Sequence, residues 1–129
     1  AKTYRYVQSS GTFNSLGMVK IIFPNRFSVY LHDTNHRDYF DKIDRSLSSG
    51  CVRVENPLEL TEYLLNDEVN WSLEKITETL QNERTKFVKI KKRVSFHLLY
   101  WTAWSENNKL IFRDDIYNLD ANLYNQLRN

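Results

Sequence analysis

Apolar positions near the start of the chain follow the alternation of short β-strands. Residues 18–23 and 27–31 are rich in β-branched and aromatic side chains, and the tripeptide Pro-Asn-Arg at residues 24–26 separates them. Proline restricts its own backbone and that of the preceding residue, so this tripeptide is typical of a turn. The pattern predicts a strand, a turn and a second strand that leads directly to His32.

The longest alternating run lies in the second half of the chain. Residues 94–104 carry large apolar side chains at nearly every second position and predict a strand that buries much of both faces. Asn107 and Asn108 follow, and asparagine tolerates the positive φ of a tight hairpin turn. We therefore expect residues 109–113 to return as the partner strand.

Local capping signals predict one helix well. The segment Pro57–Leu65 begins with proline at the first helical position, Asn56 precedes it as a candidate cap, and Glu59 completes a capping box. Weaker apolar stripes predict helices over residues 72–80 and 120–127, the second behind a capping Asp120. A helix or tight loop is expected over residues 36–43.

Length and composition indicate one folded domain. The chain has 129 residues, of which 41% are hydrophobic and 14% aromatic, and this composition is that of a packed globular protein. Strands and helices without an internal repeat indicate a single α+β unit over residues 1–129. The chain starts at Ala1 with neither an initiator Met nor an apolar signal region, so we expect part of the parent protein to lie upstream.

Charge argues against a nucleic-acid partner, and hydropathy argues against a transmembrane segment. The 18 Lys and Arg nearly balance the 16 Asp and Glu, which gives a formal net charge of +2. A basic cluster lies beside a β-branched run, where a solvated strand edge explains it better than a nucleic-acid site; it comprises Lys86, Lys89, Lys91, Lys92 and Arg93. No run of 18 apolar residues exists, so the sequence predicts no transmembrane segment.

The single cysteine is the first candidate for chemistry. Cys51 has no internal disulfide partner, and Gly50, one of only 3 glycines, directly precedes it. Glycine lets the backbone adopt strained dihedral angles and approach a ligand closely, as a nucleophile requires if neighbouring amides are to bind an oxyanion. Ser49 adds a small hydroxyl, and Arg53 projects to the same side of an extended strand as Cys51.

Two interpretations of these residues remain open at this point. Cys51 is either a reactive thiol activated by His32 or a buried structural thiol, and most lone cysteines are core residues. His32 ends an apolar strand where a polar segment begins, so it either faces a cleft or packs as a half-buried side chain. The sequence His-Asp-Thr-Asn-His at residues 32–36 resembles a helical zinc motif only superficially, because Asp, Thr and Asn are poor helix residues. We expect no metal and no cofactor.

The motifs around these residues resemble the L,D-transpeptidase catalytic domain. The resemblance lies in Tyr-Leu-His-Asp-Thr at residues 30–34 and Ser-Ser-Gly-Cys-Val-Arg at residues 48–53, with 19 positions (51 minus 32) from His32 to Cys51. It continues through residues 14–17 and 23–25 and into residues 100–104 and 112–117. Serine at position 49, where many family members have histidine, is similar to the longer Gram-negative branch.

The resemblance implies a specific reaction. Cys51 would attack the carbonyl before the D-Ala of a donor tetrapeptide stem and form a thioester, and a diaminopimelate amine of a neighbouring stem would resolve it as a 3→3 cross-link. His32 would act as general base and proton shuttle, Gly50 and Cys51 would supply oxyanion-hole amides, and Arg53 and Ser49 would contact substrate or the loop around the thiol.

The resemblance also implies a fold and a location. Family members have a β-rich mixed sheet with peripheral helices and work in the periplasm or cell envelope, so we expect peptidoglycan stem peptides as substrates and carbapenem-type inhibitors. It leaves two rival activities open. One is a carboxypeptidase or hydrolase that trims the same peptides with water, and the other is an inactive peptidoglycan-binding remnant.

Overall fold

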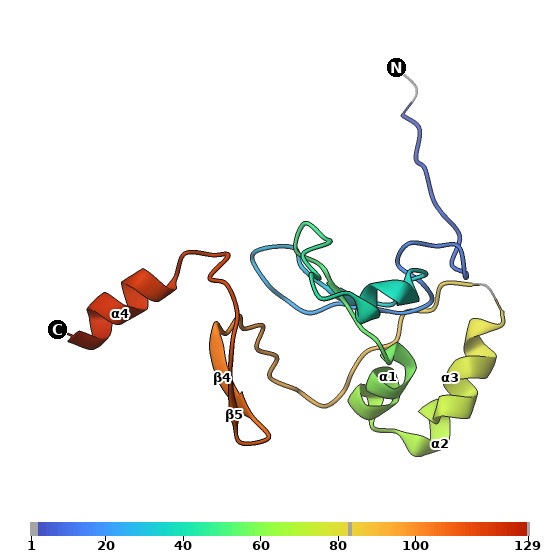
Figure 1. Cartoon of the computed structure of the whole chain (residues 1–129). Helices are drawn as coiled ribbons and strands as arrows, with labels where there is room; N and C mark the ends of the chain where they lie inside the picture. Colours follow the sequence, from blue (N-terminus) through green and yellow to red (C-terminus); the bar gives the residue numbers. More distant parts are fainter. Residues whose placement is uncertain (1–2, 83, 129) are drawn as a thin grey trace. The chain divides into compact units, whose positions relative to one another are not determined.

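The computed structural model describes residues 3–82 and 84–128, which form two compact units, Ala1–Val94 and Ser95–Asn129. The first unit contains a three-stranded sheet, a short 3-10 helix and three α-helices, and the second contains a β-hairpin and one helix (Figure 1). This mixture confirms the predicted α+β class. The assignment of residues 1–129 to a single domain stays a prediction.

The sheet of the first unit is mixed and very short. Strand β1 (Lys20–Ile21) pairs antiparallel with β2 (Leu31–His32), and β2 pairs parallel with β3 (Val52–Arg53), so β2 lies in the middle. The predicted strand–turn–strand unit is therefore present, but its ladder is confined to the residues nearest His32. The turn between β1 and β2 is held by Asn25, whose side-chain oxygen accepts hydrogen bonds from the amides of Phe27 and Val29, each at 3.0 Å.

The pleat of the sheet separates a core face from a polar face. Ile21 stands opposite Leu31 in the β1–β2 ladder, and both side chains are buried. Because neighbouring side chains along a strand point to opposite faces, Lys20 and His32 lie together on the other face. Ile76 of the third helix is also buried and lines the same cavity as Ile21.

Three helices follow the sheet: α1 (Pro57–Leu65), α2 (Glu68–Trp71) and α3 (Leu73–Leu80). Helix α1 has the predicted bounds, but the Asn56 side chain makes no capping hydrogen bond, so the expected capping box is wrong. Ser72 does cap α3 by accepting from the amide of Lys75. Glu62 of α1 accepts from the Leu73 amide at 2.6 Å and so ties α1 to the start of α3.

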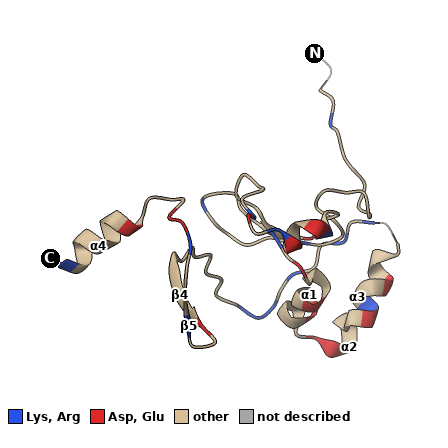
Figure 2. Ribbon diagram, viewed as in Figure 1, with Lys and Arg blue, Asp and Glu red and all other residues tan. Residues whose placement is uncertain are grey.

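The 3-10 helix η1 (Arg37–Asp41) lies between β2 and β3, within the segment predicted as a helix or tight loop. After α3, residues 84–94 contain no strand, so the predicted strand edge for the basic cluster is wrong. Figure 2 shows the basic residues of this segment on an irregular stretch of chain. Lys86 instead lies over the Trp71 ring, and Lys91 lies 3.7 Å from Asp67.

The second unit contradicts most of the strand that was predicted over residues 94–104. Residues 94–102 form no strand, and only β4 (Ala103–Glu106) pairs with β5 (Lys109–Phe112). An alternating segment becomes a strand only where another strand satisfies its backbone groups, and β5 reaches no further than Ala103. The hairpin turn itself is as predicted, because Asn107 and Asn108 both have positive φ, 50° and 59°.

Helix α4 (Asp120–Arg128) begins at the predicted residue but with a different cap. The Asp115 carboxylate accepts hydrogen bonds from the amides of Leu119 and Asp120, while the Asp120 side chain accepts from the Thr102 hydroxyl. The predicted capping role of Asp120 is therefore wrong. No helix within the described part of the chain is long and apolar enough to cross a membrane.

Candidate active site

The predicted base His32 lies on β2, and the predicted nucleophile Cys51 directly precedes the adjacent parallel strand β3. In the register of β2 and β3, His32 stands opposite Arg53, and the Val52 amide donates to the Tyr30 carbonyl at 3.1 Å. Cys51, directly before β3, is thereby placed beside Tyr30. Because side chains two residues apart share a face of a strand, Tyr30, His32, Cys51 and Arg53 all belong to the polar face of the sheet.

The environment of His32 fixes the roles of its two ring nitrogens. The residue is 5% exposed, and its Nδ1 lies 2.5 Å from the carbonyl oxygen of Asp33. A carbonyl oxygen only accepts hydrogen bonds, so in this contact Nδ1 carries the proton. The neutral imidazole then has its free lone pair on Nε2, which is the form that a general base requires.

Asp33 holds together the backbone around His32. The residue is 4% exposed, and its carboxylate accepts hydrogen bonds from the Met18 amide at 2.8 Å, the Thr34 amide at 2.7 Å and the Arg37 guanidinium at 2.5 Å. A buried carboxylate is tolerated only with such partners. Asp33 therefore joins the entry to β1, the exit from β2 and the start of η1, and it fixes the peptide whose carbonyl meets His32.

The loop before Cys51 is organised by Ser48. The Ser48 hydroxyl donates to the Cys51 carbonyl at 2.6 Å and accepts from the Gly50 amide at 3.2 Å. Gly50 has a φ of +133°, as its predicted conformational role requires. Within residues 3–82 and 84–128, the Cys51 amide has no hydrogen-bond acceptor. The Ser49 side chain likewise makes no hydrogen bond there.

Arg53 contacts the same loop from β3. Its two terminal nitrogens lie 3.4 Å from the Leu47 carbonyl, and its guanidinium lies 5.1 Å from the centre of the Tyr39 ring. Its Nε is buried and has no hydrogen-bond partner among the described residues. Arg53 thus presents a fixed cation on the face that carries Cys51, with one donor left free.

Tyr30 also belongs to this cluster, although the motifs predicted no function for it. A hydrogen bond to Cys51 is the main cause that raises the pKa of Tyr30 above its ordinary value of 10.0, and partial burial and the charge of the thiolate act in the same direction. Its ring meets the His32 ring edge-on, with 5.7 Å between centroids. Strand alternation already predicts that Tyr30 shares a face with His32, so this residue could have been found.

Asp33 and Ser48 were also missed, although both lie inside the quoted motifs. Asp33 directly follows His32, and only the fold shows that its carboxylate reaches Met18, 15 positions earlier. The sequence could not distinguish Ser48 from Ser49. The structure assigns the hydrogen bonds of this loop to Ser48 and leaves the expected substrate contact of Ser49 a prediction.

The two histidines of the zinc-like segment are not brought together as ligands. The His36 ring stacks on Tyr39, with 4.8 Å between centroids, and the His32 ring bonds the Asp33 carbonyl. Across the described ranges, no three His, Cys, Asp or Glu side chains are grouped so that they could hold a metal ion. The segment also forms no α-helix, which the zinc motif needs.

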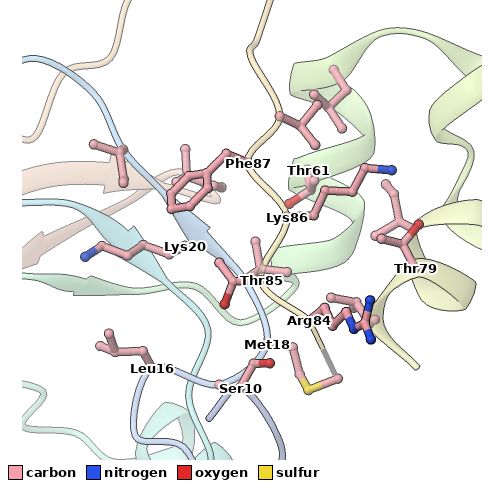
Figure 3. Close-up of a pocket in the computed structure, with 18 of the residues that line it drawn as sticks. Ser10, Leu16, Met18, Lys20, Thr61, Thr79, Arg84, Thr85, Lys86 and Phe87 are labelled. Carbon is pink, nitrogen blue, oxygen red and sulfur yellow. The ribbon is translucent and has the colours of Figure 1, made fainter. Parts of the chain in front are cut away.

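A cavity of about 370 Å³ lies elsewhere in the first unit. Its walls come from β1, α1, α3 and the segment after α3; Figure 3 labels Lys20, Thr61, Thr79 and Phe87 among the lining residues. Neither Cys51 nor His32 lines it. Cys51 and His32 therefore lie outside this cavity, whereas Lys20, on the same sheet face as His32, belongs to its lining.

Comparisons with known proteins agree with the motifs. Residues 1–91 match the YkuD family, described as the L,D-transpeptidase catalytic domain. The chain is also similar to a protein of Haemophilus influenzae named "Putative L,D-transpeptidase", with 37% identity over 120 residues. That similarity covers 93% of this chain but only 24% of the relative, so the chain spans about a quarter of the relative's length.

Proposed function

The chain belongs to the L,D-transpeptidase catalytic domain family, and on this premise we propose that it is a cysteine acyl-transferase acting on peptidoglycan. One observation carries the proposal: Cys51, directly before β3, and His32, on the neighbouring β2, belong to the same face of the sheet, and the Nδ1 of His32 is occupied by a backbone carbonyl. A thiol and an imidazole with a free Nε2 are the minimal parts of a nucleophile and its base.

In the first half of the proposed reaction, His32 Nε2 takes the thiol proton of Cys51. The sulfur attacks the carbonyl that precedes D-Ala in a donor tetrapeptide stem, and the oxyanion of the tetrahedral intermediate accepts a hydrogen bond from the Cys51 amide. The Gly50 amide is the second donor, once it leaves the Ser48 hydroxyl. The C–N bond then breaks, His32 returns its proton to the departing D-Ala amine, and a thioester remains on Cys51.

In the second half, a diaminopimelate side-chain amine of a neighbouring stem attacks the thioester. His32 Nε2 takes a proton from this amine, the new C–N bond forms a 3→3 cross-link, and the C–S bond breaks to release the Cys51 thiolate. The base must therefore act twice. The carbonyl of Asp33, itself fixed by the Asp33 carboxylate, supports this because it keeps the imidazole in one orientation.

Arg53 supports binding of the stem peptide in this proposal. Its guanidinium is held near the Cys51 loop by the Leu47 carbonyl, and its positive charge would attract a carboxylate or carbonyl of the substrate. Ser49 stands next to the nucleophile as a second candidate contact. A peptidoglycan substrate places the protein in the periplasm or cell envelope, and carbapenems are the expected inhibitors because they acylate the same thiol.

The test is incubation of the protein with tetrapeptide muropeptides, followed by mass spectrometry. Cross-linked dimers together with free D-Ala support transfer, whereas tripeptide monomers alone identify a carboxypeptidase and contradict it. A carbapenem adduct on wild-type protein that is absent from Cys51→Ser excludes the inactive remnant. Activity that a chelator abolishes and that Cys51→Ser leaves unchanged contradicts the proposed nucleophile.

Replacement of the base gives a sharper prediction. His32→Ala should slow acylation of Cys51 by a carbapenem by about 10²-fold or more, which is the effect of a missing general base. His36→Ala is the matched control, since that exposed histidine stacks on Tyr39 and makes no contact with Cys51 or His32 in the described structure. Equal acylation rates for wild type and His32→Ala would remove His32 from the mechanism.

A further inference from the structure

Arg37, the first residue of η1, contacts the ends of both strands that position the candidate active site. One of its terminal nitrogens donates to Asp33 Oδ1 and the other to the Glu55 carbonyl, each at 2.5 Å. Asp33 directly follows β2, and Glu55 lies two positions beyond the end of β3. The planar guanidinium therefore holds two acceptors from neighbouring strands in one fixed geometry.

The strand pairing that Arg37 bridges is short. Strands β2 and β3 have two residues each, and beside them the Val54 amide donates to the His32 carbonyl at 2.9 Å. So small a ladder is only weakly stable by itself. A side chain that bonds the ends of both strands adds a restraint on the separation between His32 and Cys51.

Arg37 also partners the carboxylate next to His32. The Asp33 side chain is 6% exposed, and Arg37 pairs with it as a cation. A buried carboxylate that loses such a partner is strongly disfavoured, so Asp33 would turn toward water. The carbonyl of this same residue accepts from His32 Nδ1, and a displaced Asp33 would therefore release the imidazole.

We propose that Arg37 is a positioning residue for the candidate active site: by bonding Asp33 and the Glu55 carbonyl, it fixes the His32 ring and its distance from Cys51. This inference rests on the proposed roles of Cys51 and His32 and adds a residue that lies outside both motifs. Arg37 acts through the backbone of β2 and β3.

The first experiment measures the orientation of His32 without any reaction. Long-range ¹H–¹⁵N spectra identify the tautomer of its neutral imidazole, which should carry the proton on Nδ1 in wild type and on both nitrogens in a mixture in Arg37→Met. Circular dichroism selects variants that remain folded, and loss of general stability would not change the tautomer of a folded protein. An unchanged tautomer in Arg37→Met overturns the proposal.

The second experiment measures acylation of Cys51 over a range of carbapenem concentrations. Arg37→Met should lower the maximal rate about tenfold, because a small misplacement of a reacting group is enough for such a loss. The half-saturating concentration should change less than twofold, since Arg37 acts on the reacting pair. Arg37→Lys should lie between the two, because one ammonium group keeps the charge beside Asp33 but cannot copy the guanidinium fork.

Two comparisons show whether Arg37 acts through His32. In the His32→Ala background there is no imidazole to orient, so Arg37→Met should have less than half of its effect on a logarithmic scale. An equal effect in both backgrounds overturns the proposal. Arg45→Met is the matched control, because Arg45 lies on the same connection between β2 and β3 and its side chain donates to the Lys42 carbonyl.

The two readouts distinguish this inference from the proposed function. The tautomer needs only a folded protein, whereas acylation and cross-link formation need a reactive Cys51. An Arg37-dependent tautomer in a protein that forms neither carbapenem adduct nor cross-links overturns the proposed function and with it the catalytic part of this inference. Acylation that is equally fast in wild type and Arg37→Met, in a protein that forms cross-links, overturns the role of Arg37 alone.

Discussion

At the scale of single residues, Asp33 and Gly17 show how closely the site is packed. Gly17 has a φ of +58°, and a Cβ built on it would lie 2.2 Å from Asp33 Oδ2. No real side chain tolerates that separation, so the buried carboxylate occupies the space that a larger residue would need. Glycine at position 17 is therefore required by the backbone conformation and by Asp33 together.

Gly17→Ala should destabilise the first unit by at least about 2 kcal/mol, because a positive-φ residue is strained and Asp33 must give up hydrogen bonds to avoid the clash. Urea unfolding followed by circular dichroism measures this change. Gly11→Ala is the control, since Gly11 also has a positive φ, +152°, but a Cβ there meets nothing within 4 Å. Equal losses for the two variants would attribute the effect to strain alone.

At the scale of elements, the helices were easier to predict than the strands. Helix α1 has the predicted bounds because proline at its first position and the apolar spacing along it are local signals. Helix α4 also starts as predicted, yet its capping carboxylate belongs to Asp115, which lies 5 positions before Asp120. A cap supplied by a loop depends on how that loop folds, and the sequence does not show this.

Helix α4 should lose stability in acid. The Asp115 carboxylate accepts hydrogen bonds from the amides of Asp120 and Leu119, and these hold the pKa of Asp115 below its ordinary value of 3.8. A lowered pKa means that the charged form stabilises the fold, so this contribution is present above pH 3.8 and disappears as the pH falls through the lower, folded-state pKa. Amide chemical shifts of α4 should follow this titration.

Asp115→Asn keeps an acceptor oxygen but removes the ionisable group, so the acid-dependent change in α4 should disappear. Asp114→Asn is the control, because the Asp114 side chain makes no hydrogen bond to α4 in the described structure. The same acid transition in Asp115→Asn as in wild type would show that another group governs the start of this helix.

At the scale of the whole chain, the site belongs to the first unit. Every contact described around Cys51 and His32 lies within Ala1–Val94, and the family match ends at residue 91. The second unit has its own hairpin and its own hydrogen bond between Thr102 and Asp120. The chemistry on the sheet face is therefore expected to depend on the first unit.

A chain that ends at Val94 should keep the pH profile of Cys51 alkylation by iodoacetamide and its dependence on His32, because Cys51, His32 and the residues hydrogen-bonded to them all belong to the first unit. The measurement compares iodoacetamide rates across pH for the shortened and the 129-residue chains, with His32→Ala in each as the control. A shortened chain that stays folded by circular dichroism but loses the profile would place part of the site's support in the second unit.

The sequence by itself determined the family, the α+β class, the bounds of α1 and the Asn107–Asn108 turn. These rest on local patterns: short motifs, caps, and residues that tolerate particular backbone angles. It also identified Cys51, His32, Gly50 and Arg53 as candidates, whose catalytic roles stay predictions. The strand predicted over residues 94–104 was wrong up to residue 102, because an alternating pattern does not specify a partner strand.

Only the tertiary structure decided which side chains meet. The strand register places Lys20, Tyr30, His32, Cys51 and Arg53 on one face, and the register depends on pairing between segments that lie far apart in the sequence. The contact of Asp33 with Met18 and the placement of Cys51 beside Tyr30 arise in the same way. Local sequence specifies how a segment bends, whereas packing between distant segments determines what each side chain touches.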